Sequence, residues 1–516
     1  MNQLTERHFG VGIDLGTSMS AVSRVDISSG RYDFQEARDL GGSTEIPSAV
    51  YVHPDGQMDF GSAAVRQRRN PLNASRVVSN FKLLLRENEP LRLDGLEVVV
   101  EPVDLVRGLL GFLKECLERH LRMTCSRAVV TVPAHQEFDT DYRSLLRSAA
   151  MGSQPLFDSL DIIHEPDAVL MSIGDLAEFA DQRVLVFDMG GGTLDVSIRE
   201  VEIRDTGPFL HQLAVTGSGA AGRQVTDDLA DALIAKREQS QQFTYSDEDR
   251  RKARQLNFLE VDEAKKFLSG HQARDEDRVV RSTIWCPSGR QPFDVSFSSA
   301  DFAAVVSPTA ERAMKTVQEA LDEAGLVARD IDTYFMVGGS SQLSQIRNSL
   351  IDLFEGRPPS AMQGKFGSVS PTLAVVRGAA IADLDREDEA AEIIDIPLPE
   401  LEQLMPYPIS LLTTKGGLEE AHVLVPRGSN LPYGPVNRTY YVPSGEDAIS
   451  FSLLRGEGAL DDCVTLEPHL AVLPAGPSTN DEEIDVQWFV DKSGVLTLSA
   501  HDALGNELIT MRESIG

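Results

Sequence analysis

The sequence is poor in cysteine and in basic residues. Four cysteines occur among 516 residues, and Cys116, Cys125, Cys286 and Cys463 form no C-x-x-C unit. Scattered cysteines are typical of reduced, mostly buried thiols in a cytoplasmic protein, and they indicate neither a disulfide framework nor a cysteine-bound metal. The 48 Lys and Arg residues against 80 Asp and Glu give a net charge of −32. This charge argues against nucleic-acid or anionic-membrane binding, because both require clustered basic side chains.

Several familiar signatures are also absent. The chain contains no G-x-x-x-x-G-K-[ST], so the common mononucleotide-binding fingerprint does not apply. The first residues lack a basic segment followed by an apolar one, and no apolar run approaches the roughly 18 residues of a membrane span. We therefore expect neither a signal peptide nor a transmembrane helix.

The chain is long enough for two or three domains, and 41% of its residues are hydrophobic. Up to about Asp383, strand patterns alternate with helical patterns, which is typical of an α/β fold. Beyond about Met405, short strand patterns are separated by turn signals such as PSGED and DKSG, which predicts an antiparallel β-sandwich. The acidic run DLDREDEAAE and the apolar segment IIDIPLPELEQL lie between these regions. We interpret them as a solvated helix end and an interdomain linker.

Two glycine-containing segments with flanking strand patterns suggest phosphate binding. VLVFDMGGGTLDVSI, residues 184–198, indicates a tight hairpin with Asp188 at the end of its first strand. VGIDLGTSMSAVSRVD repeats the design around Asp14. Glycine lets another group approach the backbone N–H donors, and an aspartate at a strand end can face a hydrated cation. One such hairpin is equally well explained as a simple turn, but two copies predict two similar lobes that hold a metal-bound phosphate in one cleft.

Segments in both regions resemble the DnaK-type chaperones of the heat-shock protein 70 family, and the resemblance covers nearly the whole chain. In addition to the two hairpins, these segments are IIHEPDAVLMSIG, FMVGGSSQLSQIR, VLVPRGSNLP, FSLLRGEGALDD and VQWFVDKSGVLTLSAHDALGNE. The resemblance implies a two-lobed, actin-like (ribonuclease H-like) α/β ATPase domain over residues 1–385. A linker over 386–404 and an antiparallel β-sandwich peptide-binding domain over 405–516 would follow.

The same resemblance implies an activity, a cofactor and partners. The chain would hydrolyse ATP slowly with Mg²⁺, and the nucleotide state would control binding of extended apolar polypeptide through the linker Ile393–Ile396. A J-domain co-chaperone and a nucleotide-exchange factor would act on it. The family continues after its β-domain into a helical lid, which we do not expect here because Gly516 follows that region directly.

The resemblance also implies roles for individual residues. Asp14 and Asp188 would hold the hydrated Mg²⁺, and Glu165 would join its water shell. Lys82 would contact the γ-phosphate and the attacking water, and Asp195 would orient that water or accept its proton. The catalytic set would be Lys82, Glu165, Asp188, Thr193 and Asp195. The phosphate and adenosine contacts would be Asp14, Gly16, Thr17, Ser18, Gly190, Gly191, Gly192, Asp262, Lys265, Lys266, Ser269, Gly338, Gly339, Ser340 and Gln342. Taken without the resemblance, Lys82 is an ordinary surface lysine and Glu165 an acid favoured at a helix start.

In the β-domain, the resemblance assigns peptide contacts to two groups of residues. One wall of a peptide cleft would comprise Leu411 and Thr413, on the loop LLTTKGG. The other would comprise Tyr440, Val442, Ile449 and Phe451, on the strands TYYVP and AISFSLL. The alternative is that these six are ordinary sandwich residues, because sandwich strands bury every second side chain.

The adenine end departs from the family pattern. Asp262 stands where a glutamate is typical, Gln342 where an arginine stacks on the base, and Thr372 where an aspartate is usual. An amide stacks weakly compared with a guanidinium, so we expect weaker adenine binding and intact phosphate chemistry. Pro133 and Arg143 fall where the family has its interdomain switch.

Two other functions are compatible with the sequence. A non-catalytic nucleotide-binding adaptor would use both domains to recognise one dedicated protein partner. A small-molecule kinase on the same fold would leave the C-terminal domain without a role, and it is the less favoured of the two.

Overall fold

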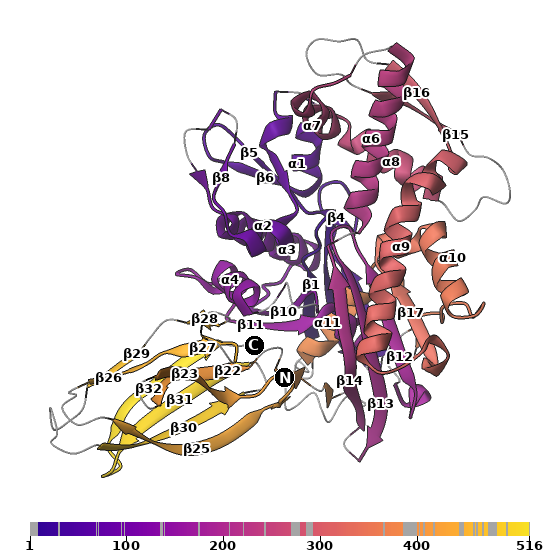
Figure 1. Ribbon diagram of the computed structural model, residues 1–516. Coiled ribbons are helices and arrows are strands. Elements are labelled where there is room, and N and C mark those ends of the chain that lie inside the picture. Colours follow the sequence, from indigo (N-terminus) through magenta and orange to yellow (C-terminus); the bar gives the residue numbers. More distant parts are fainter. Residues whose placement is uncertain are drawn as a thin grey trace, which may run out of the picture. The chain divides into compact units, whose positions relative to one another are not determined.

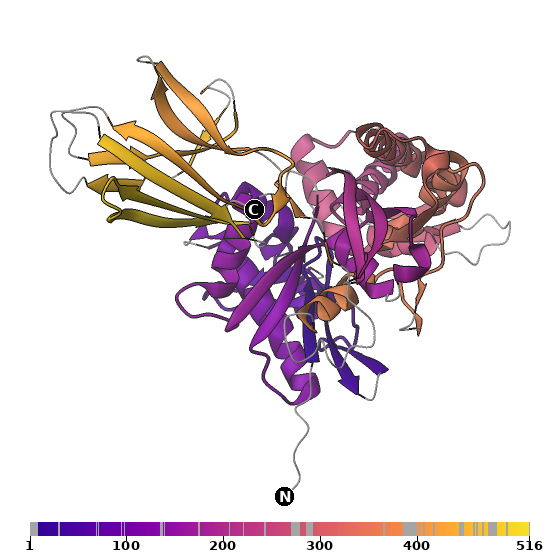
Figure 2. The same ribbon diagram turned by 90° about the horizontal axis from the view of Figure 1, so that it is seen from below.

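The structure is a computed structural model of the chain (Figures 1 and 2). It describes residues 9–514 except 29–30, 69, 71, 94, 97–98, 135–137, 139, 174–175, 206, 220, 242–243, 270–278, 285–292, 365–366, 385–399, 402, 406–407, 416–417, 443–447, 458–459, 461–462, 467–468, 473–481 and 492–493. The chain divides into two compact units, one of Met1–Phe138 and Leu145–Glu400 and the other of Asp139–Ser144 and Leu401–Gly516. The linker segment Ile393–Ile396 lies outside the described residues.

The first unit contains two sheets of similar design. In each sheet, the first strand of a hairpin also pairs with a parallel strand on its other side. Strand β1 pairs antiparallel with β2 and parallel with β10, and β12 pairs antiparallel with β13 and parallel with β17. The first sheet runs β11-β10-β1-β2-β3 with β4 beside β2, and the second β17-β12-β13-β14-β20. Their bounds are β1 Phe9–Asp14, β2 Met19–Ser28, β3 Arg31–Glu36, β4 Ile46–Pro47, β10 Arg127–Val132, β11 Ser159–His164, β12 Arg183–Met189, β13 Leu194–Arg204, β14 Gly207–Ser218, β17 Thr333–Val337 and β20 Glu400–Leu401. The alternation of strands and helices predicted up to Asp383 is observed.

Helices and short strands complete two lobes, which lie side by side in both views (Figures 1 and 2). The first lobe, residues 9–138 and 145–164, adds α1 Gly61–Gln67, α2 Phe81–Glu87, α3 Pro102–Leu121, β5 Ala49–Val52, β6 Met58–Phe60, β7 Val77–Ser79, β8 Leu91–Arg92 and β9 Val99–Val100. Helix α4, Thr140–Met151, begins in the second unit and continues into this lobe from Leu145. The second lobe, residues 183–368, adds α6 Gly222–Gln241, α7 Asp247–Leu256, α8 Phe258–Ser269, α9 Ser299–Glu323, α10 Ser344–Leu353, β15 Val279–Ile284, β16 Phe293–Ser298, β18 Gln363–Gly364 and β19 Gly367–Ser368. A capping box starts α9, in which Ser298 and Asp301 satisfy each other's backbone N–H groups.

Two helices, α5 (Glu165–Ile173) and α11 (Ala374–Leu384), connect the lobes. Helix α5 contacts strands of both sheets, and α11 packs on α5 and on β1. Where these two helices cross, a Cβ on Gly378 would lie 1.6 Å from the carbonyl oxygen of Ala168. The helix backbones therefore touch without an intervening side chain, which requires glycine at this position.

The second unit consists of strands after residue 402. One antiparallel sheet runs β23-β22-β27-β28, and another runs β25-β30-β31-β32. Side chains of both sheets share one apolar core that includes Leu424, Trp488 and Leu498. The bounds are β21 Gln403–Leu404, β22 Ile409–Lys415, β23 Leu418–Val425, β24 Asn430–Leu431, β25 Tyr433–Val442, β26 Ala448–Phe451, β27 Leu453–Arg455, β28 Val464–Thr465, β29 His469–Val472, β30 Glu482–Val490, β31 Val495–Asp502 and β32 Glu507–Ser514. The expected β-rich character beyond Met405 is confirmed, and so is the hairpin of β30 and β31.

One local prediction is wrong. LLTTKGG was expected to be a loop, but β22 continues to Lys415. The strand pairs with β23, with Thr413 opposite Glu420, so this pairing keeps residues 411–415 in a strand.

Candidate functional site

The two glycine hairpins of the lobes meet each other. In the second hairpin, Asp188 lies opposite Asp195, and the Gly190 N–H donates to the Thr193 carbonyl at 3.0 Å. Its glycines face the first hairpin: a Cβ on Gly191 would lie 2.1 Å from Ser18 Oγ, and one on Gly192 would lie 2.3 Å from Thr17 Cγ2. Glycine is therefore required here for close approach between the two lobes.

A cavity of about 580 Å³ opens beside this contact and is lined by both lobes. Most of the predicted nucleotide-site residues line it: Asp14, Gly16, Thr17, Ser18, Lys82, Glu165, Asp188, Gly190, Gly191, Thr193, Asp262, Lys265, Lys266, Ser269, Gly338, Gly339, Ser340 and Gln342. Gly192 and Asp195 are buried and do not line it. One oxygen of Asp195 instead accepts the Ala134 N–H at 2.9 Å.

Three carboxylates and one lysine line this cavity together: Glu165, Asp188 and Lys82 are buried, and Asp14 is half-buried. Asp14 ends β1 and accepts a hydrogen bond from Thr131 Oγ1 at 3.2 Å, while Glu165 starts α5. Lys82, on α2, forms an ion pair with Glu165, and both side chains are almost fully buried. Their sequence positions are far apart, and the meeting of the two lobes brings them together.

The electrostatics of this cluster favour an additional cation. Burial raises the pKa of Asp14, although Lys82 and Thr131 oppose the shift. Burial, together with the carboxylates of Glu165, Asp195 and Asp14, raises the pKa of Asp188 well above its usual value. Burial also raises the pKa of Glu165 to about 7, against the opposing charge of Lys82. A divalent cation would offset this crowding of negative charge.

The donor set fits a hydrated Mg²⁺ and a phosphate chain. Within the described ranges, no three His, Cys, Asp or Glu side chains gather as a direct ligand cluster. Mg²⁺ keeps several waters and takes one or two carboxylates, so Asp14 and Asp188 suit it without such a cluster. Thr17 Oγ1 is buried and has no hydrogen-bond partner among the described residues, which suits a hydroxyl that contacts a phosphate or a water.

The outer part of the cavity carries the predicted adenosine residues. On α8, Asp262 pairs with Lys265 at 3.0 Å and with Lys266 at 2.8 Å. Burial would raise the pKa of Asp262, but these two lysines outweigh it and lower the pKa. Gln342 donates to Ser341 Oγ at 2.9 Å, and Thr372 lines the same cavity.

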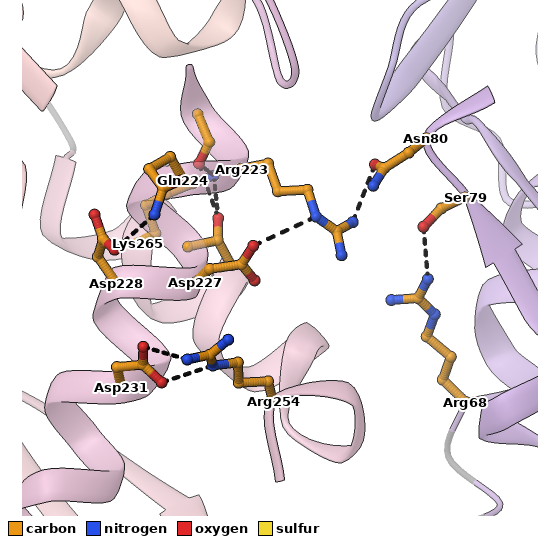
Figure 3. A network of polar contacts seen from close by, with 12 residues as sticks. Arg68, Ser79, Asn80, Arg223, Gln224, Asp227, Asp228, Asp231, Arg254 and Lys265 are labelled. Carbon is orange, nitrogen blue, oxygen red and sulfur yellow. Dashed lines mark hydrogen bonds and ion pairs between the residues drawn. The ribbon is translucent and has the colours of Figure 1, made fainter. Parts of the chain in front are cut away.

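Sequence reasoning missed several cavity residues, most notably two arginines. Arg68 follows α1 and donates to Ser79 Oγ at 3.0 Å, whereas Arg223 lies in the first turn of α6 and donates to Asn80 Oδ1 at 3.0 Å (Figure 3). The Arg223–Asn80 hydrogen bond joins the two lobes. Both arginines lie outside the glycine motifs, and no local pattern distinguishes them from other surface arginines.

The remaining predicted residues lie elsewhere. Pro133 is buried immediately after β10, and Arg143 lies on α4. In the second unit, Leu411, Val442 and Phe451 are buried in the apolar core. The other three predicted peptide contacts, Thr413, Tyr440 and Ile449, are partly exposed.

Comparisons with known proteins are consistent across the chain. The family model described as "Hsp70 protein" matches residues 91–514. "Chaperone protein HscA homolog" of Azotobacter vinelandii is 30% identical over 528 residues, covering 96% of this chain and 76% of that protein. "Chaperone protein DnaK" of Thermosipho melanesiensis is 27% identical over 503 residues, covering 96% of this chain and 79% of its own length. The DnaK of Halobacterium salinarum is 28% identical over 512 residues. Among the described helices, none has the length and apolarity to cross a membrane.

Proposed function

Because the chain belongs to the Hsp70 family, we propose that it is an ATP-dependent chaperone that hydrolyses ATP with Mg²⁺ to control peptide binding. The observation that carries this proposal is the convergence of both glycine hairpins, three carboxylates and the buried Lys82 on one cavity. The repeated sheet design supports an actin-like domain over residues 1–385. The shared core of two antiparallel sheets supports a β-sandwich over 405–516, with 386–404 as the linker.

In this proposal the chain's own groups position the phosphates. Backbone N–H groups of the two hairpins bind the phosphate oxygens, and Thr17 and Thr193 add hydroxyls. Asp14 and Asp188 would hold the water shell of Mg²⁺, which would supply charge neutralisation, and Glu165 would extend that shell. Such fixed donors and charges supply most of the catalysis in phosphoryl transfer.

Lys82 and Asp195 are the residues assigned to the attacking water. Lys82 is fixed by its ion pair with Glu165, so its ammonium group is held at the wall of the cavity. Asp195 lies behind the cavity wall with one oxygen held by Ala134. Its role in orienting the attacking water therefore stays a prediction from the family resemblance.

Metal dependence tests the site directly. Asp14→Ala and Asp188→Ala should weaken Mg·ATP much more than ATP measured with a chelator, because both carboxylates act through the ion. Asp322→Ala, on the exposed face of α9, is the matched control and should change neither affinity. Equal losses with and without Mg²⁺ would contradict the metal assignment.

Turnover separates chaperone from adaptor. Phosphate release should be slow and should rise when an extended apolar heptapeptide is added, and Lys82→Ala should abolish it while keeping ATP affinity. Binding of ATP with no turnover under any peptide would favour the non-catalytic adaptor.

Peptide binding by the second unit needs its own test. We propose that Thr413, Tyr440 and Ile449 contact an extended apolar peptide, because all three are partly exposed, with Tyr440 and Ile449 also packed against the apolar core. Ile449→Ser should accelerate release of a labelled heptapeptide, whereas Leu504→Ser, at an exposed turn, should not. Identical release from both variants would place the peptide elsewhere. J-domain and nucleotide-exchange partners are part of the same proposal.

A further inference from the structure

Two arginines from opposite lobes line the cavity. Figure 3 shows the guanidinium groups of Arg68 and Arg223 in the space between the two walls. Arg68 contacts Ser79 from the first lobe, and Arg223 reaches across from α6 to Asn80. Each lobe therefore contributes one arginine to the same cavity.

The main chain of Arg223 is joined to the second glycine hairpin. Its N–H donates to the Gly191 carbonyl at 2.6 Å, and the Gly222 N–H donates to the Gly190 carbonyl at 3.2 Å. An anion held by the N–H groups of this hairpin would therefore lie beside the start of α6. The Arg223 side chain extends from that point toward the first lobe.

The basic side chains that line the cavity have polar partners. Lys82 is paired with Glu165, and Lys265 and Lys266 are paired with Asp262. Arg68 donates to Ser79 Oγ, and Arg223 donates to Asn80 Oδ1. Arg223 also forms an ion pair with Asp227, at 3.5 Å from its Nε.

The charges of the two arginines act on each other. Burial, with the nearby charge of Arg223, lowers the pKa of Arg68 to about 10, so Arg68 remains protonated at neutral pH. The cavity thus holds two like charges that repel, and an anion between them would remove that repulsion. Guanidinium groups are well suited to this, because their N–H forks match phosphate oxygens.

We propose that Arg68 and Arg223 are specificity-determining residues that make nucleotide affinity increase with the number of phosphate groups. This inference rests on the proposed function, because the ligand class is a nucleoside polyphosphate in the same cavity. Each added phosphate brings negative charge that both lobes attract. The pair therefore favours ATP over ADP and AMP and favours closure of the lobes around the more highly charged ligand.

Calorimetric titration of ATP, ADP and AMP tests this with the full chain. Arg68→Gln and Arg223→Gln should each weaken ATP on the order of three- to tenfold, ADP less, and AMP hardly at all. The losses should shrink at high salt, because the Debye length falls from about 10 Å at 0.1 M to about 3 Å at 1 M. Inorganic tripolyphosphate should weaken in parallel with ATP, which separates the effect from adenine recognition.

Three further variants separate charge from structure. Arg254→Gln removes the same charge from α7, where Arg254 pairs with Asp231 at 2.5 Å outside the cavity, and should leave all affinities unchanged. Arg223→Lys keeps the charge, and it should keep most of the ATP-to-AMP affinity ratio. Asn80→Gly removes the bridging amide but tolerates the φ of +67° at this position, and it should also keep the ratio.

If the glutamine variants lose equal affinity for ATP, ADP and AMP, the inference is overturned. It is also overturned if the double variant Arg68→Gln with Arg223→Gln binds tripolyphosphate as tightly as the wild type. If Arg223→Gln does not fold, the wild-type ratio of ATP affinity to AMP affinity is measured at several salt concentrations. A ratio that does not change with salt overturns the inference. A wild-type chain that binds no nucleotide would refute the proposed function instead, and tripolyphosphate would then test the arginine pair alone.

Discussion

Replacing Gly192 with alanine tests the contact between the two hairpins. The new Cβ would lie 2.3 Å from Thr17 Cγ2, 2.5 Å from its Oγ1 and 2.7 Å from its Cβ. Thr17 is 3% exposed, and because it is β-branched, rotation about χ1 cannot remove both branches from the contact. Carbon atoms pack at about 3.5–4.0 Å, so the hairpins must separate by roughly 1 Å.

This separation should cost about 1–3 kcal/mol, the usual range for an overpacked core. Without nucleotide, the cost should appear as a lower thermal unfolding midpoint. With nucleotide, ATP affinity should fall as well, by about tenfold for each 1.4 kcal/mol, because both hairpins are proposed to bind one phosphate chain. Calorimetry measures the second effect.

Gly190→Ala is the matched control, because its Cβ would meet a single atom, Thr193 O, at 3.8 Å, which is an ordinary contact. Adding Thr17→Ala to Gly192→Ala removes two of the three clashing atoms and should restore part of the stability. Nucleotide-free Gly192→Ala and Gly190→Ala proteins with the same unfolding midpoint would refute the reasoning.

Three other outcomes are expected. Arg199→Leu removes the guanidinium that lies 2.6 Å from the buried Asp167 carboxylate, so it should lower the free energy of unfolding by about 3–5 kcal/mol. The double variant Asp167→Leu with Arg199→Leu should recover most of this loss. A double variant that is no more stable than Arg199→Leu in urea denaturation would contradict the prediction. Gln342→Arg should tighten ATP by about 0.5–1 kcal/mol through stacking on the base, and unchanged calorimetric affinity would remove that explanation of weak adenine binding. Burial raises the pKa of Cys125 to about 11, so its alkylation at pH 8 should be far slower than that of a free thiol and should accelerate with pH up to that value, whereas a rate independent of pH would contradict the shift.

Local sequence predicted the hairpins well because their determinants are local. The apolar strands, Asp188 and the three glycines specify the turn of β12 and β13 without reference to the rest of the chain. The same holds for the β30–β31 hairpin. The resemblance implied a loop at LLTTKGG, but β22 continues to Lys415, where it pairs with Leu418 of β23 in a hairpin.

Residues that depend on how distant segments meet could not be predicted in this way. Arg68 and Arg223 are two of 48 basic residues, and their shared cavity exists only because the lobes face each other. Arg199 lies in a strand and is 1% exposed, but its burial depends on Asp167 and Gln212 from other elements. The placement of Asp195 behind the cavity wall likewise follows from a contact with Ala134 that no motif encodes.

The crossing of α5 and α11 restricts how the two lobes can move. Since Gly378 rests against the carbonyl of Ala168, the helices cannot come closer, and sliding along either axis would drive backbone into backbone. Rotation about the contact avoids that collision, so the crossing would permit a hinge motion of the lobes and would resist a shear. In such a hinge motion, parts of the cavity wall that lie further from the helix crossing would move further. A bulkier residue at position 378 would therefore change the opening angle of the whole cleft from a point that no nucleotide touches.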